Sequence, residues 1–178
     1  YNAGLYYIQE PSAMSPVEYL DIQEGMKVLD LCSAPGGKST QIASLLNNTG
    51  LLVSNDISGQ RIKAVLRNIE IMGITNALIM NDAPEKIALR FSSYFDRILL
   101  DVPCSGEGMF RKDPAAINEW SENAVELCSQ RQRRILADVY PALKQNGTLI
   151  YSTCSYSKQE NEEISDWLCE EFDLSPIQ

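Results

Sequence analysis

The sequence predicts an α/β fold in which a mostly parallel sheet carries helices on both faces. Short apolar segments alternate with segments of helical periodicity, and repeated strand–helix units imply a parallel sheet with right-handed crossovers. The predicted strands are Lys27–Leu31, Leu51–Asn55, Ala77–Met80, Arg97–Asp101 and Thr148–Ser152. The predicted helices between them are Ser39–Leu46, Ser58–Met72, Pro84–Leu89 and Ser121–Leu143.

Length predicts a single domain, because 178 residues bury a sizeable core. Residues 1–25 are expected to form a lead-in segment packed on the sheet, with a helix over Ser12–Leu20, and residues 26–178 the core itself. The start, Tyr1–Gly4, has neither an initiator methionine nor a signal pattern, so we expect a fragment of a longer protein.

The C-terminal part predicts one more helix, beginning near Gln159. Ser157 and Glu160 have the spacing of a capping box. Four apolar residues at helical spacing follow: Ile164, Trp167, Leu168 and Phe172. Gly147, directly after Asn146, is expected to end the long helical segment before the last strand.

Composition argues against several classes of protein. No run of about 18 apolar residues occurs, so no membrane span is expected. Five cysteines without a Cys-x-x-Cys pair, and no histidine, disfavour structural zinc and a disulfide framework, and fit reduced thiols in the cytoplasm. The net charge of −9 repels nucleic acid at long range, so RNA binding would need basic surface on other domains.

Two cysteines have similar settings, Cys104 within PCSG and Cys154 within STCS, and each follows a predicted strand. The carboxyl ends of parallel strands meet at the edge where open α/β sheets bind ligands. Polar neighbours disfavour a core role for this pair, whereas Cys32, Cys128 and Cys169 are expected to be buried. Two thiols at one edge predict covalent chemistry beside a ligand.

A glycine-rich turn, DLCSAPGGK at residues 30–38, joins the first strand to a helix. Gly36 and Gly37 let the backbone approach a ligand, and the helix amino terminus offers unpaired N–H donors. The turn resembles the end of a P-loop, which makes an NTPase one interpretation. A P-loop needs a glycine where this chain has Cys32, and Pro35 removes an N–H group, so we treat the NTPase as the weaker alternative.

S-adenosylmethionine fits the same turn, because backbone N–H groups there can hold its carboxylate. Asp56 follows the second strand, about 20 residues beyond the turn, where a carboxylate accepts hydrogen bonds from ribose hydroxyls. Asp82 follows the third strand and is expected to reach the adenine amino group. Its alternative role is a turn or helix cap before Pro84.

Two thiols beside S-adenosylmethionine suggest methylation of cytosine at carbon 5. A thiolate that adds to carbon 6 makes carbon 5 nucleophilic enough to take the methyl group. Lys38 or the sulfonium can raise the thiolate fraction, and Asp101 is placed to face both cofactor and base. The sequence DVPC at 101–104 lacks the stacking motif of amino-group methyltransferases, which favours a ring carbon. The chemistry leaves open whether Cys104 or Cys154 attacks.

Three segments resemble motifs of the Sun-family RNA cytosine-5 methyltransferases: Asp30–Ser39, Asp101–Pro114 and Ser152–Glu162. Tyr6–Met14 also resembles their lead-in segment, and the likeness is greatest to the bacterial small-subunit ribosomal RNA enzymes. The resemblance implies a Rossmann-like class I S-adenosylmethionine-dependent methyltransferase fold, with residues 26–178 as a truncated catalytic core. It implies methylation of carbon 5 of cytosine in RNA, ribosomal RNA in particular.

The same resemblance assigns residue roles. Cys154 is the nucleophile, Cys104 assists release of the methylated product, Asp101 contacts base and cofactor, and Lys38 lines the site. The residues implied to bind S-adenosylmethionine are Cys32, Ser33, Ala34, Pro35, Gly36, Gly37, Lys38, Asp56, Arg61, Asp82 and Asp101. No metal site is implied.

The chain departs from the family in completeness. Family members carry an RNA-recognition region before this core, and their sheet ends in a β-hairpin, whereas only Asp173–Gln178 follow the last predicted helix. A missing hairpin leaves an exposed sheet edge, and we expect the isolated fragment to be inactive. We expect a cytoplasmic monomer whose RNA substrate is gripped mainly by absent domains. A scaffold that holds S-adenosylmethionine or RNA without turnover is the second alternative, which the paired thiols disfavour.

Overall fold

The computed structural model describes residues 3–177, without the side chain of Glu119. The chain divides into two compact units, a first unit of Tyr1–Asp101 with Asp138–Ile150 and a second unit of Val102–Ala137 with Tyr151–Gln178. The predicted boundary between a lead-in segment (1–25) and a core (26–178) stays a prediction, and its first two residues lie outside the described residues.

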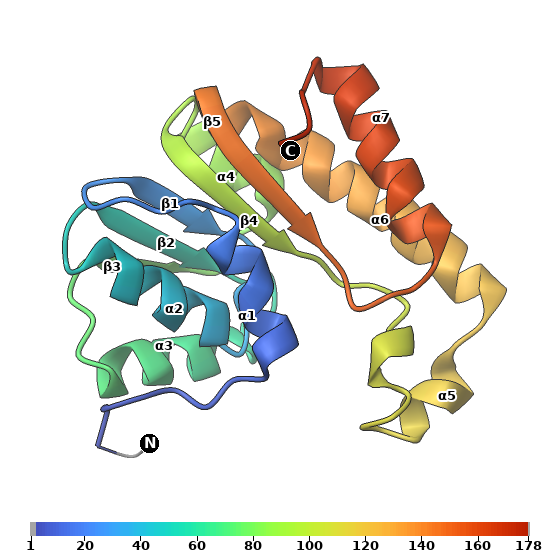
Figure 1. Cartoon of the computed structure of the whole chain (residues 1–178), viewed down its shortest axis with the longest axis horizontal. Coiled ribbons are helices and arrows are strands. Elements are labelled where there is room, and N and C mark those ends of the chain that lie inside the picture. Colours follow the sequence, from blue (N-terminus) through green and yellow to red (C-terminus); the bar gives the residue numbers. More distant parts are fainter. Residues whose placement is uncertain (1–2, 178) are drawn as a thin grey trace. The chain divides into compact units, whose positions relative to one another are not determined.

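The first unit is built on a sheet of five strands in the order β3-β2-β1-β4-β5 (Figure 1). The strands are β1 (Lys27–Asp30), β2 (Leu51–Asn55), β3 (Ala77–Met80), β4 (Phe95–Asp101) and β5 (Leu143–Ser152), whose last two residues belong to the second unit. β1 runs parallel to β2 and β4, with Leu29 opposite both Val53 and Ile98. The order therefore reverses beside β1, which makes the carboxyl end of β1 the switch point of the sheet.

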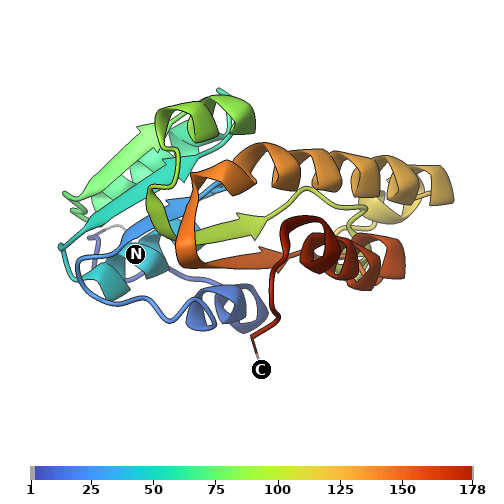
Figure 2. The ribbon, with the colours of Figure 1, turned by 90° about the horizontal axis from the view of Figure 1, so that it is seen from above.

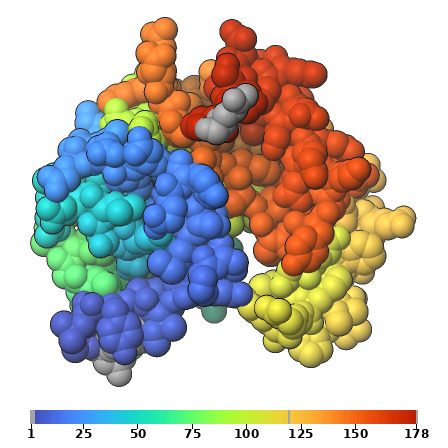
Figure 3. Space-filling model, in the orientation of Figure 1, coloured from blue at the N-terminus to red at the C-terminus, as the bar shows by residue number. Residues whose placement is uncertain are grey.

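Helices cover both faces of this sheet, as predicted. The helices of the first unit are α1 (Pro11–Glu18), α2 (Gly37–Leu46), α3 (Ile62–Ile71) and α4 (Pro84–Arg90). Figures 1 and 2 show α4 on the face opposite to α1 and α2. On the surface of the unit, α1 lies beside α2 (Figure 3). The central strands β1 and β2 are buried from their second residue onward, which is why their apolar residues are consecutive and do not alternate with polar ones.

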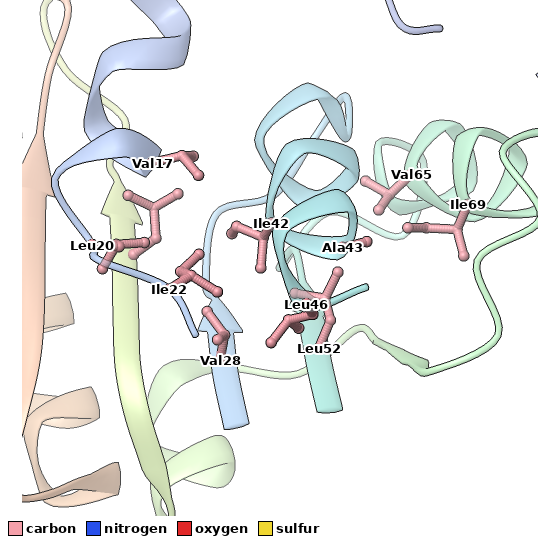
Figure 4. Packing of buried hydrophobic residues seen from close by; sticks show 11 residues of the cluster. Val17, Leu20, Ile22, Val28, Ile42, Ala43, Leu46, Leu52, Val65 and Ile69 are labelled. Carbon is pink, nitrogen blue, oxygen red and sulfur yellow. The ribbon is translucent and has the colours of Figure 1, made fainter. Parts of the chain in front are cut away.

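One hydrophobic cluster joins α1, α2 and α3 to the sheet (Figure 4). Val17 of α1, Ile42 of α2 and Val65 of α3 are completely buried there, over Val28 and Leu52 of the strands. Burial of each such side chain contributes about 1.5–3 kcal/mol. The cluster fixes the amino-terminal end of α2, and with it the turn that follows β1.

The second unit contains mostly helices and loops. Its elements are the 3₁₀ turn η1 (Glu107–Met109), α5 (Ala115–Glu119), most of α6 (Glu122–Val139), the 3₁₀ turn η3 (Lys158–Glu160) and α7 (Glu162–Phe172). The predicted apolar face of the last helix is confirmed, since Ile164 and Leu168 are buried. The Trp167 ring packs against Phe172 and beneath the guanidinium of Arg133. Figure 3 shows α7 on the surface of this unit.

The expected end of the long helix at Gly147 is wrong. α6 ends at Val139, a 3₁₀ turn η2 (Tyr140–Ala142) follows, and β5 already begins at Leu143. Pro141 cannot continue a helix, because it lacks an N–H group and its ring clashes with the preceding turn. Asn146 has a positive φ of 63° inside β5, so the Asn-Gly pair marks an irregularity within the strand rather than a helix terminus.

Candidate active site

The turn after β1 is shaped by residues that leave no room for side chains. Gly36 has a φ of 109°, a conformation that side-chain-bearing residues avoid. A Cβ atom on Gly37 would lie 2.9 Å from the ring of Tyr7. Beneath the turn, the Ser39 hydroxyl donates to Asp30 Oδ2 (2.7 Å) and accepts from the Ser54 hydroxyl (2.9 Å). The turn is therefore held rigidly against the strand ends.

A cavity of about 230 Å³ lies over this turn, within the first unit. Its lining includes seven of the predicted cofactor-binding residues, namely Cys32, Ser33, Ala34, Pro35, Gly37, Lys38 and Asp101. It also includes residues that sequence reasoning missed: Asp30 and the lead-in residues Tyr7, Ile8, Gln9, Glu10 and Ala13. Four of the predicted residues, Gly36, Asp56, Arg61 and Asp82, are not part of its lining.

Two polar atoms at this cavity are buried without a partner. Asp30 Oδ1 and Ser33 Oγ have no hydrogen-bond partner among the described residues. Burial raises the pKa of the Asp30 carboxyl to about 7. Buried polar atoms are normally bonded, so these two mark a position for a ligand. Asp30 ends a strand in the same way as the acids that the sequence reasoning did select, and this shared position could have identified it.

Lys38 and Asp101 form an ion pair at the cavity, with 2.6 Å between Nζ and Oδ2. The Lys38 side chain is mostly buried, and Asp101 is about one-third exposed. The Lys38 ammonium group therefore lies against the carboxylate of Asp101, the last residue of β4, and holds it at the rim of the cavity.

Asp56 supports the turn, and its predicted contact with the ribose of the cofactor stays a prediction. Its carboxylate is buried and accepts hydrogen bonds from the backbone N–H groups of Ala34 (3.3 Å) and Ser58 (2.9 Å). The exposed Arg61 lies 3.4 Å from Asp56 Oδ2 and donates to the Ala34 carbonyl oxygen (3.2 Å). Asp56 and Arg61 thus fasten the second half of the turn.

Asp82 pairs with an arginine instead of capping a helix. Its Oδ2 lies 2.8 Å from Nη1 of Arg90, and its backbone exchanges two hydrogen bonds with the Asn55 side chain. The N-terminal cap of α4 is Ala83, and no side chain bonds to that end of the helix. The alternative role of Asp82 as a helix cap is therefore wrong.

The two predicted thiols meet in the second unit. Cys104 Sγ lies 2.9 Å from Cys154 Sγ, and the Cys154 backbone N–H points at Cys104 Sγ (3.3 Å). Both cysteines are unbridged, Cys154 exposed and Cys104 partly buried. The hydrogen bond to Cys154 and burial raise the pKa of the Cys104 thiol. The Cys104 thiol therefore ionises less readily than an ordinary cysteine, while either sulfur can be the donor of the pair.

Close backbone contact fixes the second thiol. The N–H of Gly108 donates to the Cys154 carbonyl oxygen (2.7 Å), and a Cβ atom on Gly108 would lie 2.7 Å from the same oxygen. Only glycine permits this approach. The other three cysteines are partly buried, and burial raises the pKa of Cys32 to about 12 and raises that of Cys128 as well. Cys32 and Cys128 are therefore poor nucleophiles.

Two carboxyl groups beside the thiol pair were missed as site residues. Glu107 Oε2 accepts hydrogen bonds from the Ser155 hydroxyl (2.7 Å) and from the N–H groups of Tyr156 (2.5 Å) and Ser157 (3.1 Å). Burial alone would raise the pKa of Glu107, but these donors lower it below its ordinary value. The second carboxyl group, that of Glu160, is completely buried. The predicted capping box of Ser157 and Glu160 is wrong, because the Ser157 side chain makes no capping hydrogen bond to the helix end.

Within the described residues, no group of three or more Cys, Asp or Glu side chains is arranged to hold a metal ion. In the same part of the chain, no helix combines the length and the apolar character needed to cross a bilayer.

Comparison with known proteins identifies relatives along nearly the whole chain. Residues 17–175 match the family model described as 16S rRNA methyltransferase RsmB/F. Ribosomal RNA small subunit methyltransferase F from Pectobacterium carotovorum is 43% identical over 172 residues, which are 96% of this chain and 36% of that protein. The protein of the same name from Escherichia coli O9:H4 is 41% identical over the same coverage. The chain spans about a third of the length of these relatives.

Solved structures show the same fold. NSun6 from Pyrococcus horikoshii, determined with SFG, superposes with a TM-score of 0.86 at 30% identity over 96% of this chain and 43% of that one. A methyltransferase homolog from the same organism superposes with a TM-score of 0.85 at 34% identity, over 99% of this chain and 56% of that one. A SAM-dependent O-methyltransferase from Thermotoga maritima, at 0.65 and 18% identity, over 93% and 51%, shares the fold alone. The predicted Rossmann-like class I methyltransferase fold is confirmed.

Proposed function

The chain belongs to the 16S rRNA methyltransferase RsmB/F family, and we propose that it methylates carbon 5 of a cytosine in ribosomal RNA with S-adenosylmethionine as methyl donor. The membership confirms the resemblance noted in the sequence. The observation that carries the proposal is the pair of unbridged cysteines whose sulfurs lie 2.9 Å apart, because a fold of this class needs no such pair unless sulfur takes part in the reaction.

The cavity over the turn suits the methionine end of S-adenosylmethionine. At about 230 Å³ it is smaller than a typical ligand pocket of about 300–1,000 Å³, so it holds part of the cofactor. The unpartnered Asp30 Oδ1 is an acceptor for the α-amino group, and the free N–H groups at the start of α2 are donors for the carboxylate. When bound, S-adenosylmethionine supplies a methyl group carried on a sulfonium.

The remaining groups of the cofactor would lie along the neighbouring strand ends. Asp56, after β2, keeps lone pairs for ribose hydroxyls, since a carboxylate has about four acceptor positions and the described contacts use three. Asp82, after β3, is one-fifth exposed and can accept from the adenine amino group beside Arg90. Arg61 is exposed next to Asp56 and can cover the ribose.

Cys154 is assigned as the nucleophile because it is the exposed member of the pair and because the raised pKa of Cys104 disfavours the Cys104 thiolate. Cys154 Sγ adds to carbon 6 of cytosine, and the displaced electron pair makes carbon 5 able to take the methyl group. Water takes the carbon-5 proton, the electrons of that carbon–hydrogen bond restore the ring double bond, and the electrons of the carbon 6–sulfur bond return to Cys154. Cys104 assists this last step by donating a hydrogen bond to the departing sulfur.

We assign Asp101 to a hydrogen bond with the edge of the cytosine base, and we assign Lys38 to holding Asp101 in place. The ion pair fixes Asp101 at the cavity rim, where it can accept a hydrogen bond from the exocyclic amino group of cytosine. Asp101 and Cys104 are three positions apart along the chain, a span of at most about 11 Å.

RNA containing 5-fluorocytosine tests the two thiol assignments, because fluorine cannot leave carbon 5 as a proton does. The chain extended by the flanking segments that its relatives carry is expected to form a covalent adduct stable on a denaturing gel, and its Cys154→Ala variant to form none. Cys104→Ala is expected to stay trapped on unmodified RNA, and Cys128→Ala serves as control. An adduct that survives Cys154→Ala would mean that the wrong cysteine was chosen. Free turnover by Cys104→Ala would remove its role in release.

A thermal-shift comparison separates this proposal from the two alternatives. S-adenosylmethionine is expected to raise the midpoint of unfolding, since a ligand bound only by the folded state stabilises it. ATP or GTP with magnesium is expected to have no effect, and stabilisation by a nucleotide alone would favour the NTPase. Stabilisation by S-adenosylmethionine without methyl incorporation into RNA by the intact protein would favour the scaffold.

A further inference from the structure

The buried side chain of Glu160 connects the two loops that carry the thiols. It accepts hydrogen bonds from the Ser105 N–H (3.0 Å to Oε2), the Ser105 hydroxyl and the Ser155 hydroxyl (2.8 Å to Oε1). Ser105 directly follows Cys104, and Ser155 directly follows Cys154. One carboxyl group thus binds the residue next to each cysteine.

The same carboxyl group is anchored to α6. Gln132 Nε2 donates to Glu160 Oε2 (2.7 Å) and to the carbonyl oxygen of Pro103 (3.0 Å). The Tyr151 hydroxyl lies 2.6 Å from the Glu160 carbonyl oxygen and 3.0 Å from Gln132 Oε1. Gln132 and Glu160 are both completely buried, so water does not compete for these contacts. A buried carboxyl group is tolerated only where donors surround it, and here they come from three separate segments.

We propose that Glu160 is a positioning residue that holds the loops of Cys104 and Cys154 together, so that their sulfurs stay in hydrogen-bond contact. It acts through Ser105 and Ser155, the neighbours of the two thiols. The consequence for catalysis rests on the proposed function, since Cys104 can assist the departure of Cys154 only while the two sulfurs touch. The effect on thiol geometry can be measured without any methyl transfer.

The test measures how fast the thiol oxidant diamide joins Cys104 to Cys154, a step in which two thiols lose two protons and two electrons to diamide. Leu and Gln have similar sizes, but only Gln can replace the hydrogen bonds of Glu160. Its amide oxygen can accept from the Gln132 side chain and the Ser105 N–H, and its amide N–H groups can donate to the two serine hydroxyls, which can act as acceptors instead of donors. We expect Glu160→Leu to slow disulfide formation at least tenfold and Glu160→Gln to stay within threefold of the native rate. Glu162→Leu, an exposed position on α7, is the control and should react at the native rate.

Equal rates of disulfide formation in Glu160→Leu and Glu160→Gln would overturn the proposal, because the hydrogen bonds of residue 160 would then have no effect on the distance between the two sulfurs. If Glu160→Leu does not fold, the double variant Ser105→Ala with Ser155→Ala removes both bridged hydroxyls, and a native rate there would also overturn it. The two proposals fail separately. A chain that carries the flanking segments and forms the disulfide rapidly but gives no adduct with 5-fluorocytosine RNA contradicts the proposed function and leaves the role of Glu160 intact.

Discussion

Asp30 and Glu160 are both completely buried carboxyl groups, yet their surroundings give them different tasks. All the donors around Glu160 come from the protein, whereas Asp30 keeps one oxygen without a partner at the edge of a cavity. Their sequence contexts suggested the first residue of the glycine-rich turn for Asp30 and a helix cap for Glu160. Residue type and spacing could not separate these roles, because the partners lie up to 55 positions away along the chain.

The raised pKa of Asp30 predicts how stability depends on pH in the cofactor-free protein. Its pKa rises from 3.8 to about 7 on folding, mainly through burial, so its stabilising contribution is full below about pH 4 and is lost as pH rises through about 7. We expect the free energy of unfolding to fall by roughly 2 kcal/mol between pH 5 and pH 7, as measured by urea denaturation. The chain has no histidine to titrate in this range. An unchanged slope in Asp30→Asn would contradict the assignment.

At the scale of elements, strands and helices followed local periodicity well, and β2 and β3 have the predicted bounds. The prediction was wrong at the end of α6. There the helical pattern of the sequence continues through Pro141, and the Asn146-Gly147 pair suggested a helix end that is too late in the chain. The covalent chemistry of proline ends the helix there, and pairing with β4 extends β5 back to Leu143. The gain from adding a strand to a sheet depends on a neighbour that local sequence does not contain.

The turn between β1 and α2 gives the prediction at this scale. Gly36→Ala is expected to cost about 1–3 kcal/mol of stability, because alanine is strained at a φ of 109°, and to weaken S-adenosylmethionine binding at least tenfold. Gly73→Ala is the matched control, with a positive φ of 64° in open space. It should lose stability and keep its cofactor affinity, both followed by denaturation and calorimetry. Equal losses of affinity in the two variants would mean that the turn does not shape the cofactor site.

For the whole molecule, charge and length lead to one expectation about RNA. The chain carries a net charge of −9 and spans 36% of its curated relatives. Phosphate binding depends on basic surface and on the release of counterions, so we expect the chain alone to bind ribosomal RNA weakly at 150 mM salt, an about physiological concentration. Addition of the flanking segments that relatives carry should raise the affinity at least 100-fold in a filter-binding assay. Tight binding by this chain alone would contradict this expectation and would mean that the chain itself carries the main RNA-binding surface.

The sequence by itself determined the class of fold, the turn that follows the first strand, the pair of cysteines that the fold brings together and the family, because each of these depends on residue types at short spacings. Only the tertiary structure decided that Lys38 pairs with Asp101, that Asp30 keeps an oxygen for a ligand and that Glu160 ties the cysteine loops together. The physical reason is that burial and hydrogen-bond partnership are properties of space. A polar side chain acquires its role from donors and acceptors that folding brings beside it from distant segments.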